Sequence, residues 1–152
     1  MIDYLYQRKL WQLILVLIFI LCLINFIILF YGFKGFTHLE AFKNDVYFPD
    51  GYIIGMVWTF LMTMQVYIFK KTTNTALRKL LFFLIVGCIA YPVYTQGFSN
   101  PTLVILGNLV TMVYSSFIAG LFFQARNKFF YGILLTPIWI TFVTFLMFRV
   151  YS

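Results

Sequence analysis

Long apolar segments make up most of this chain, and the polar residues gather between them. A helix rises about 1.5 Å per residue, so roughly 20 apolar residues are needed to cross a bilayer. Five segments reach that length: 10–31, 51–69, 80–98, 102–123 and 129–148. The apolar positions form blocks and do not alternate with polar ones. The pattern therefore predicts an all-α membrane protein, with one domain built as a bundle of five transmembrane helices.

Composition supports the same class. Hydrophobic residues make up 63% of the 152 residues and charged residues only 10%. Ordinary soluble domains carry about 25% charged residues. A soluble domain of this length could not bury so much apolar surface. We therefore expect a multi-pass integral membrane protein.

The basic residues divide unequally between the two ends of the predicted helices. Eight of the 11 flank one side: Arg8, Lys9, Lys70, Lys71, Arg78, Lys79, Arg126 and Lys128. Lys34, Lys43 and Arg149 fall on the other side. Cytoplasmic loops are enriched in Lys and Arg, which predicts a cytoplasmic N-terminus and an outside C-terminus. This pattern suits a bacterial plasma (inner) membrane. It gives no case for nucleic-acid binding, and a contact with anionic membrane lipid is the most that it supports.

The five segments contain no Asp, Glu, Lys, Arg or His. Ionisable residues inside a membrane mark proton pathways, and a hydrolase needs a nucleophile beside a base. Their absence counts against a proton-coupled transporter and against a membrane enzyme. Cys22 and Cys88 have no CxxC spacing, and we expect both to be free, buried thiols with no metal site. The sequence therefore favours binding over catalysis.

One connection, residues 32–50, is much longer than the others. Long loops in compact proteins frequently cover binding sites, so this outer loop is a candidate lid with His38 and Phe42 in it. His38 is the only histidine, and a solvated loop histidine is favoured over a ligand-binding role. Pro92 and Pro137 interrupt two predicted helices, where a kink can open space inside a bundle.

Small residues recur at two places in the chain. Gly107, Thr111, Ser115 and Ala119 follow one another at four-residue spacing, which favours close helix packing within the fold over a homodimer contact. The second predicted helix begins after Pro49 and Asp50, with Asp50 as a candidate N-cap. One face of that helix then carries Gly51, Gly55, Trp58, Met62 and Gln65. From spacing alone this face is either a packing stripe or the lining of a pocket.

Two segments, PDGYIIGMVWTFLM (49–62) and GILLTPIW (132–139), resemble the TspO/translocator protein family of tryptophan-rich sensory proteins, also called peripheral benzodiazepine receptor-like. The likeness covers nearly the whole chain and is strongest at 41–64 and 129–148. The chain departs from the family pattern at Asp50, where a second proline is usual, and at Ile138, where tyrosine is usual. Trp139 stands two residues before the usual tryptophan, whose place falls near Thr141.

The resemblance implies a five-helix bundle, often a homodimer, whose pocket opens under the first outer loop. Such a pocket binds flat hydrophobic ligands, including porphyrins, haem-like tetrapyrroles and sterols, with no obligatory cofactor. Porphyrin degradation is proposed for some members, but we expect no enzyme here.

The family resemblance favours a pocket lining over a packing stripe for the helical face that carries Trp58. We expect Trp58 to stack on the ligand, Gly51 and Gly55 to make room, and Pro49, Met62 and Gln65 to lie beside it. Further candidates for the lining are Tyr91, Tyr94 and Trp139, for which plain packing is equally supported, together with Pro137 and Thr141. The predicted function is binding of a small hydrophobic ligand with a sensory, regulatory or transport role. The alternatives are a non-catalytic accessory or structural subunit of a larger membrane complex and, third, a small transporter.

Overall fold

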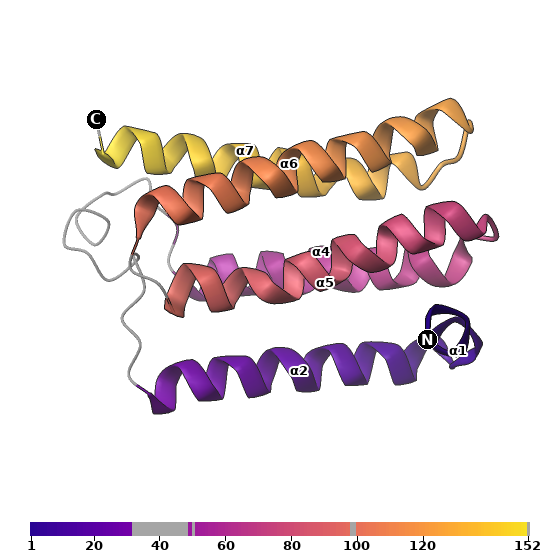
Figure 1. The fold of residues 1–152 in the computed structure, drawn as a ribbon, viewed down its shortest axis with the longest axis horizontal. Coiled ribbons are helices and arrows are strands. Elements are labelled where there is room, and N and C mark those ends of the chain that lie inside the picture. The colour runs from indigo at the N-terminus through magenta and orange to yellow at the C-terminus, as the bar shows by residue number, and fades with distance from the viewer. Residues whose placement is uncertain (32–48, 50, 98–99, 152) are drawn as a thin grey trace.

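The computed structural model describes residues 1–31, 49, 51–97 and 100–151. Within these ranges the chain forms helices joined by short turns, with no strand (Figure 1). The helices are α1 (Ile2–Gln7), α2 (Leu10–Phe30), α4 (Gly51–Lys71), α5 (Thr75–Gly97), α6 (Pro101–Gln124) and α7 (Phe130–Tyr151). Five of them, α2 and α4–α7, are long and apolar enough to cross a membrane, as the sequence predicts.

The helix ends differ from the predicted ones where polar residues cap them. The apolar pattern predicts that the third spanning helix begins at residue 80, but α5 begins at Thr75. The side chain of Asn74 accepts hydrogen bonds from the backbone amides of Ala76 and Leu77 at 2.9 and 3.2 Å. This cap starts the helix inside the polar connection, one turn before the apolar segment. Asn100 caps α6 in the same way, and Pro101 occupies its first turn.

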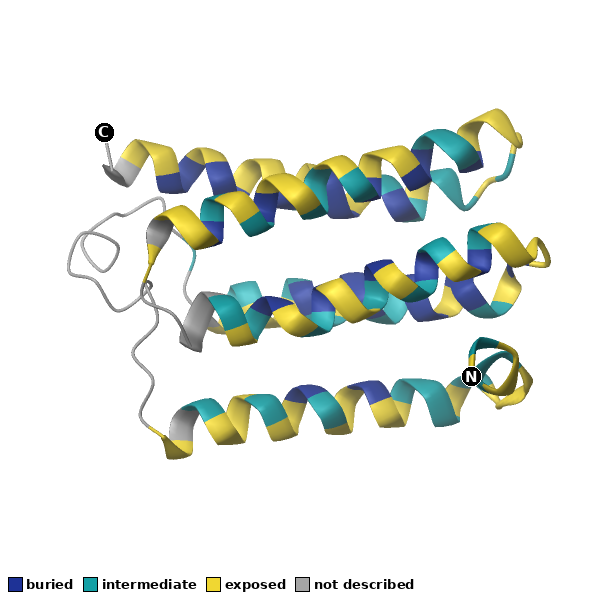
Figure 2. Ribbon diagram, viewed as in Figure 1, coloured by how far each residue is buried: buried dark blue, intermediate teal, exposed yellow. Residues whose placement is uncertain are grey.

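The five long helices form a closed ring in the order α2, α4, α7, α6, α5, with a further contact between α4 and α5 inside it. In Figure 1, α2 runs along one edge of the molecule and the α6–α7 pair along the opposite edge. Buried residues face the interior of this bundle and exposed residues face outward (Figure 2). The outer surface carries large apolar side chains such as Phe19, Val110 and Phe145, each at least 65% exposed. An apolar exterior of this extent matches a lipid surround and an integral multi-pass membrane protein.

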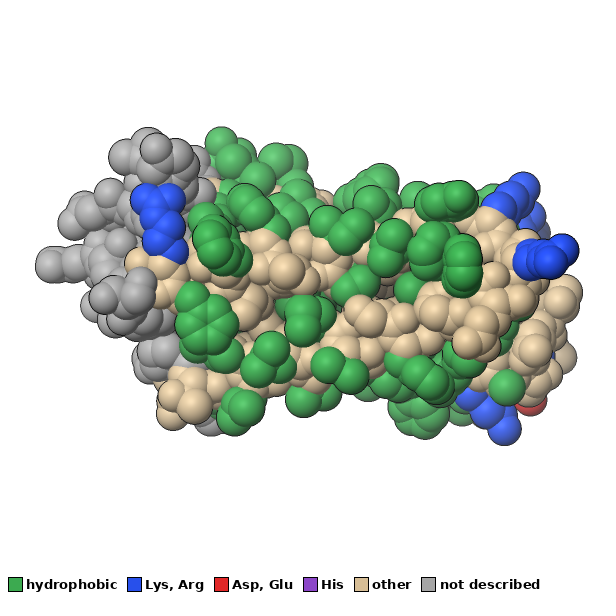
Figure 3. Space-filling model, turned by 90° about the horizontal axis from the view of Figure 1, so that it is seen from above, with side chains coloured by type: hydrophobic (Ala, Val, Ile, Leu, Met, Phe, Trp, Pro, Cys, Tyr) green, Lys and Arg blue, Asp and Glu red, His purple; other side chains and the backbone are tan. Residues whose placement is uncertain are grey.

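Basic side chains gather at one end of the bundle, which we call the basic end. It holds the eight residues from the N-terminal segment and from the α4–α5 and α6–α7 connections, while Arg149 lies toward the other end (Figure 3). The two termini lie at opposite ends of the molecule (Figure 1). The described part of the chain thus has the charge asymmetry that the sequence predicts.

The short helix α1, which the span pattern does not predict, lies across the basic end beside α5. Arg78 of α5 is 3.8 Å from Asp3 of α1 and stacks over the ring of Tyr6 at 3.9 Å. The Lys70 ammonium donates a hydrogen bond to the backbone carbonyl of Tyr6. These contacts hold α1 against the ends of α4 and α5.

Both cysteines are free thiols, as expected, but they have different surroundings. Cys88 is buried inside the bundle, whereas Cys22 lies on the exposed surface of α2. The expectation that Cys22 is buried in the fold is therefore wrong. Block hydrophobicity places a residue at membrane depth but does not say which side of its helix faces protein.

Candidate functional site

A partly open cavity of about 110 Å³ lies among α2, α4 and α5. Its lining is formed by Leu21 and Asn25 of α2, by Ile54, Gly55, Trp58, Thr59 and Met62 of α4, and by Cys88, Tyr91 and Pro92 of α5. It lies in the half of the bundle away from the basic end, because Trp58 is only seven residues from the start of α4. We call it the Trp58 cavity.

Aromatic contacts position Trp58 at the wall of this cavity. Trp58 and Tyr91 are both 7% exposed, and their ring centroids are 4.3 Å apart with an angle of 45° between the planes. Tyr91 in turn meets the edge of Tyr94 at 5.3 Å. The Tyr94 ring lies against Gly107 of α6, where a Cβ atom would come within 2.6 Å of it. Gly107 therefore allows the close approach of α6 that supports the aromatic cluster.

Two buried amides cross-link the helices. The Gln65 amide donates to the Thr136 hydroxyl of α7 at 3.0 Å and contacts the Cys88 sulfur at 3.7 Å. Gln65 is fully buried and does not line the Trp58 cavity. Asn108 makes the corresponding bond to Thr144 between α6 and α7, also at 3.0 Å. These amides join helices to one another, which is the ordinary use of such groups in membranes.

The structure brings together four of the predicted lining residues: Gly55, Trp58, Met62 and Tyr91. Tyr94 stands directly behind Tyr91. Gln65 lies on the same face of α4, but its amide donates a hydrogen bond to Thr136 of α7. The predicted face of α4 thus turns inward from Trp58 to Gln65, while Gly55 remains open toward its surface.

The three predicted residues of α7 do not line the Trp58 cavity. Pro137 is buried, and Trp139 is half-buried with its ring 5.6 Å from that of Phe142. Thr141 is exposed, and its hydroxyl donates to the carbonyl of Pro137 at 2.7 Å. The α7 residues that face the interior include Ile133, Thr136, Ile140, Val143, Thr144, Leu146 and Met147.

The remaining predicted residues are the first residue of α4 or precede this helix in the sequence. Pro49 is half-buried just before the helix, and Gly51 is its first residue. His38, Phe42 and Asp50, together with the proposed lid, lie outside the described residues.

The sequence prediction missed the contribution of α2, which supplies Leu21 and Asn25. Asn25 donates to the carbonyl of Leu21 in its own helix at 2.9 Å. An amide in the middle of an otherwise apolar segment was the available signal for this position. Pro92 was named as a source of space, and it does line the cavity.

A shallow depression of about 590 Å³ adjoins the Trp58 cavity on the surface of α4. Asn25, Gly55 and Thr59 line both spaces. The depression continues over Tyr52, Met56 and Phe60, which are exposed on the outside of the bundle. The Trp58 cavity therefore borders a hollow that faces the lipid.

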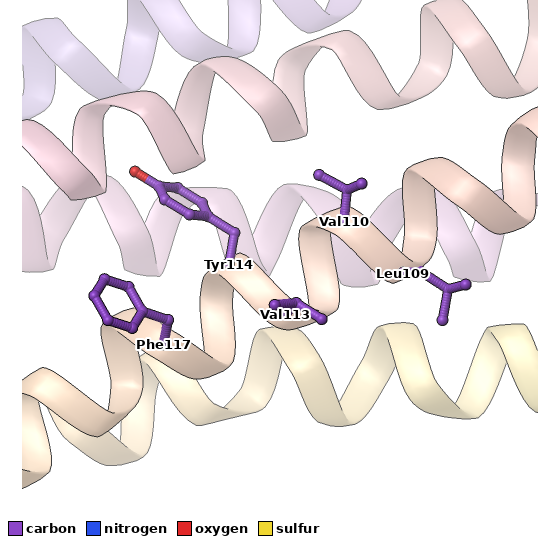
Figure 4. A pocket seen from close by; sticks show the side chains of 5 residues that line it. All are labelled: Leu109, Val110, Val113, Tyr114 and Phe117. Atoms are coloured by element: carbon purple, nitrogen blue, oxygen red, sulfur yellow. The ribbon is translucent and has the colours of Figure 1, made fainter.

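A second open hollow, of about 520 Å³, lies on α6 (Figure 4). Its lining residues, Leu109, Val110, Val113, Tyr114 and Phe117, all come from this one helix. The Tyr114 hydroxyl donates to the Leu80 carbonyl of α5 at 3.0 Å, so its polar group is used within the fold. This hollow is apolar helix surface and has no converging polar groups.

The Trp58 cavity offers aromatic rings, a thioether, a thiol, an amide and a hydroxyl, and its lining includes no charged residue. The described residues contain no cluster of three or more His, Cys, Asp or Glu side chains that would hold a metal ion. Such a lining suits a flat apolar molecule held by stacking and packing.

Fold and site together define a multi-pass membrane protein with five candidate spanning helices and a cavity lined by aromatic residues. Comparisons with protein-family models, curated proteins and solved structures found no match to this chain.

Proposed function

We propose that this protein is a non-catalytic, ligand-binding membrane protein of the TspO type. It holds a flat hydrophobic molecule, such as a porphyrin, another tetrapyrrole or a sterol, against Trp58. The observation that carries the proposal is the meeting of Trp58, Tyr91 and Met62 at a partly open cavity in the helix bundle. The same α4 segment carries the most specific part of the family resemblance.

The dimensions of the cavity define how such a ligand binds. At about 110 Å³ it is smaller than the roughly 300–1,000 Å³ of typical small-molecule sites. The adjoining depression of about 590 Å³ supplies the missing room. In our proposal one edge of the ring system enters beside Trp58 and the rest lies over Gly55 and Thr59, between α2 and α4.

The proposed orientation places the basic end in the cytoplasm of a bacterial cell, by the positive-inside rule. The Trp58 cavity then lies in the outer half of the plasma membrane. A ligand bound there stays in the apolar phase throughout, which suits a sensory, regulatory or transport role.

Titration of protoporphyrin IX into purified protein, followed by tryptophan fluorescence, tests the proposal. We expect saturable quenching for the wild type and a severalfold higher Kd for Trp58→Phe, because the smaller ring stacks less strongly. Trp139→Phe is the matched control and keeps the wild-type Kd, since Trp139 is outside the cavity. Unchanged fluorescence of both the wild type and Trp58→Phe would refute the porphyrin proposal. Stoichiometric co-purification with other membrane proteins would then favour the accessory-subunit alternative.

A further inference from the structure

An apolar groove of about 250 Å³ extends from α1 at the basic end toward the middle of the bundle, and it shares no lining residue with the Trp58 cavity. Three helices of the bundle and α1 form its walls. They include Leu5 of α1, Leu13 and Leu17 of α2, Phe69 of α4, and Phe82 and Val86 of α5. The lining contains only aliphatic and phenyl side chains. Lipid chains pack into apolar surfaces of this kind.

Two lysines lie about one helical turn from lining residues of this groove, on the side of the basic end. Lys79 precedes Phe82 and Val86 by three and seven residues and therefore lies on the same face of α5. Lys9 directly precedes α2, four residues before Leu13. Both lysines are exposed.

The other charged groups around α1 have partners. Arg78 pairs with Asp3, and the Arg8 guanidinium lies over the Tyr4 ring at 4.3 Å. Lys70 donates to the Tyr6 carbonyl. Asp3 is the only acidic residue among those described, so no other described carboxylate competes for Lys9 and Lys79.

We propose that this groove binds one anionic phospholipid, with an acyl chain along α2 and α5 and the phosphate on Lys9 and Lys79. Basic pockets between transmembrane helices bind anionic headgroups, and each lysine near the membrane surface contributes about 1 kcal/mol. A zwitterionic lipid fills the same groove but gains less from the two lysines. This site does not depend on the proposed ligand function.

Native mass spectrometry of the purified protein tests the site with phosphatidylglycerol and phosphatidylcholine as separate probes. We expect the wild type to bind phosphatidylglycerol about tenfold more tightly than phosphatidylcholine. The double variant Lys9→Gln/Lys79→Gln loses this preference and keeps its affinity for phosphatidylcholine. The matched control, Lys71→Gln/Lys128→Gln, removes the same charge from the same end outside the groove and keeps the preference.

A second pair of variants tests the groove itself. Val86→Trp fills the groove and lowers the affinity for both lipids at least fivefold. Val113→Trp, at an exposed position on α6, leaves both affinities unchanged. Equal binding of the two lipids to the wild type would overturn the proposal. So would equal losses in the two lysine variants, or full binding by Val86→Trp.

Discussion

Helices α2 and α7 have similar lengths and apolar sequences, but they join the bundle in different ways. Only 17% of the spanning segment of α2 is buried, against 44% for α7. The Thr136 and Thr144 hydroxyls of α7 accept hydrogen bonds from Gln65 of α4 and Asn108 of α6. The Trp58 cavity and the apolar groove both border α2 instead.

The side chains of the two regions explain this difference. Small residues on α6, including Gly107, Ser115 and Ala119, let α6 approach its neighbours closely. The sequence of α2 contains no Gly, Ala, Ser or Thr. Its side chains are bulky and more of its surface faces outward, whereas small residues favour close packing between helices in lipid. Both candidate binding sites therefore lie beside the helix that is least buried in the bundle.

The largest expected effect comes from truncating the closely packed region. Phe122 of α6 is fully buried, so Phe122→Ala leaves a void that costs about 3 kcal/mol of unfolding free energy. Phe19→Ala on α2 is the matched control and costs little, because the Phe19 side chain is 68% exposed. Unfolding in mixed micelles with increasing sodium dodecyl sulfate measures both values. Equal losses would contradict the outward placement of Phe19 and the burial of Phe122.

A smaller loss is expected from Gly107→Ala. The new methyl group meets the Tyr94 ring, whose displacement costs about 1 kcal/mol and disturbs Tyr91 and Trp58 behind it. A Cβ atom on Gly87 meets nothing within 4 Å, so Gly87→Ala is the control and is neutral or slightly stabilising. The same unfolding assay compares the two variants. A neutral Gly107→Ala would contradict close packing at this site.

The smallest effect concerns the polar cross-links. Gln65→Leu removes the bond to Thr136, and interhelical hydrogen bonds in membranes contribute about 0.6 kcal/mol on average. Asn25→Leu keeps the unfolding free energy of the wild type, since Asn25 bonds within its own helix. Asn25→Leu instead changes the Kd for protoporphyrin IX, because Asn25 lines the Trp58 cavity. A larger stability loss for Asn25→Leu than for Gln65→Leu would reverse the comparison.

Much of the fold follows from the sequence. Apolar block length predicts the five long helices, and helical spacing predicts that Trp58, Met62 and Gln65 share one inward face. Short local signals are harder to see in advance. Helix α1 is too brief for a spanning pattern, and the Asn74 cap moves the start of α5 into a polar connection.

The composition of the site depends on how the helices surround one another. Ring order places α2 beside α4, so Leu21 and Asn25 complete the Trp58 cavity. The rotation of α7 about its axis follows from Thr136 and Thr144, which face the amides of α4 and α6. That rotation turns Thr141 outward. The apolar pattern of a single helix does not give the order of the helices around the bundle or the rotation of each helix about its axis. It therefore could not show which predicted residues line the cavity and which face away from it.

The most direct test of ligand binding at Trp58 is fluorine NMR of protein labelled with 5-fluorotryptophan. The chain has three tryptophans, Trp11, Trp58 and Trp139, so each resonance is assigned by one Trp→Phe variant. We predict that saturating protoporphyrin IX shifts the Trp58 resonance through the ring current of the stacked ligand, with little change at Trp11 and Trp139. A Trp58 resonance that does not shift at saturating protoporphyrin IX would contradict the account, whether or not the Trp11 and Trp139 resonances shift.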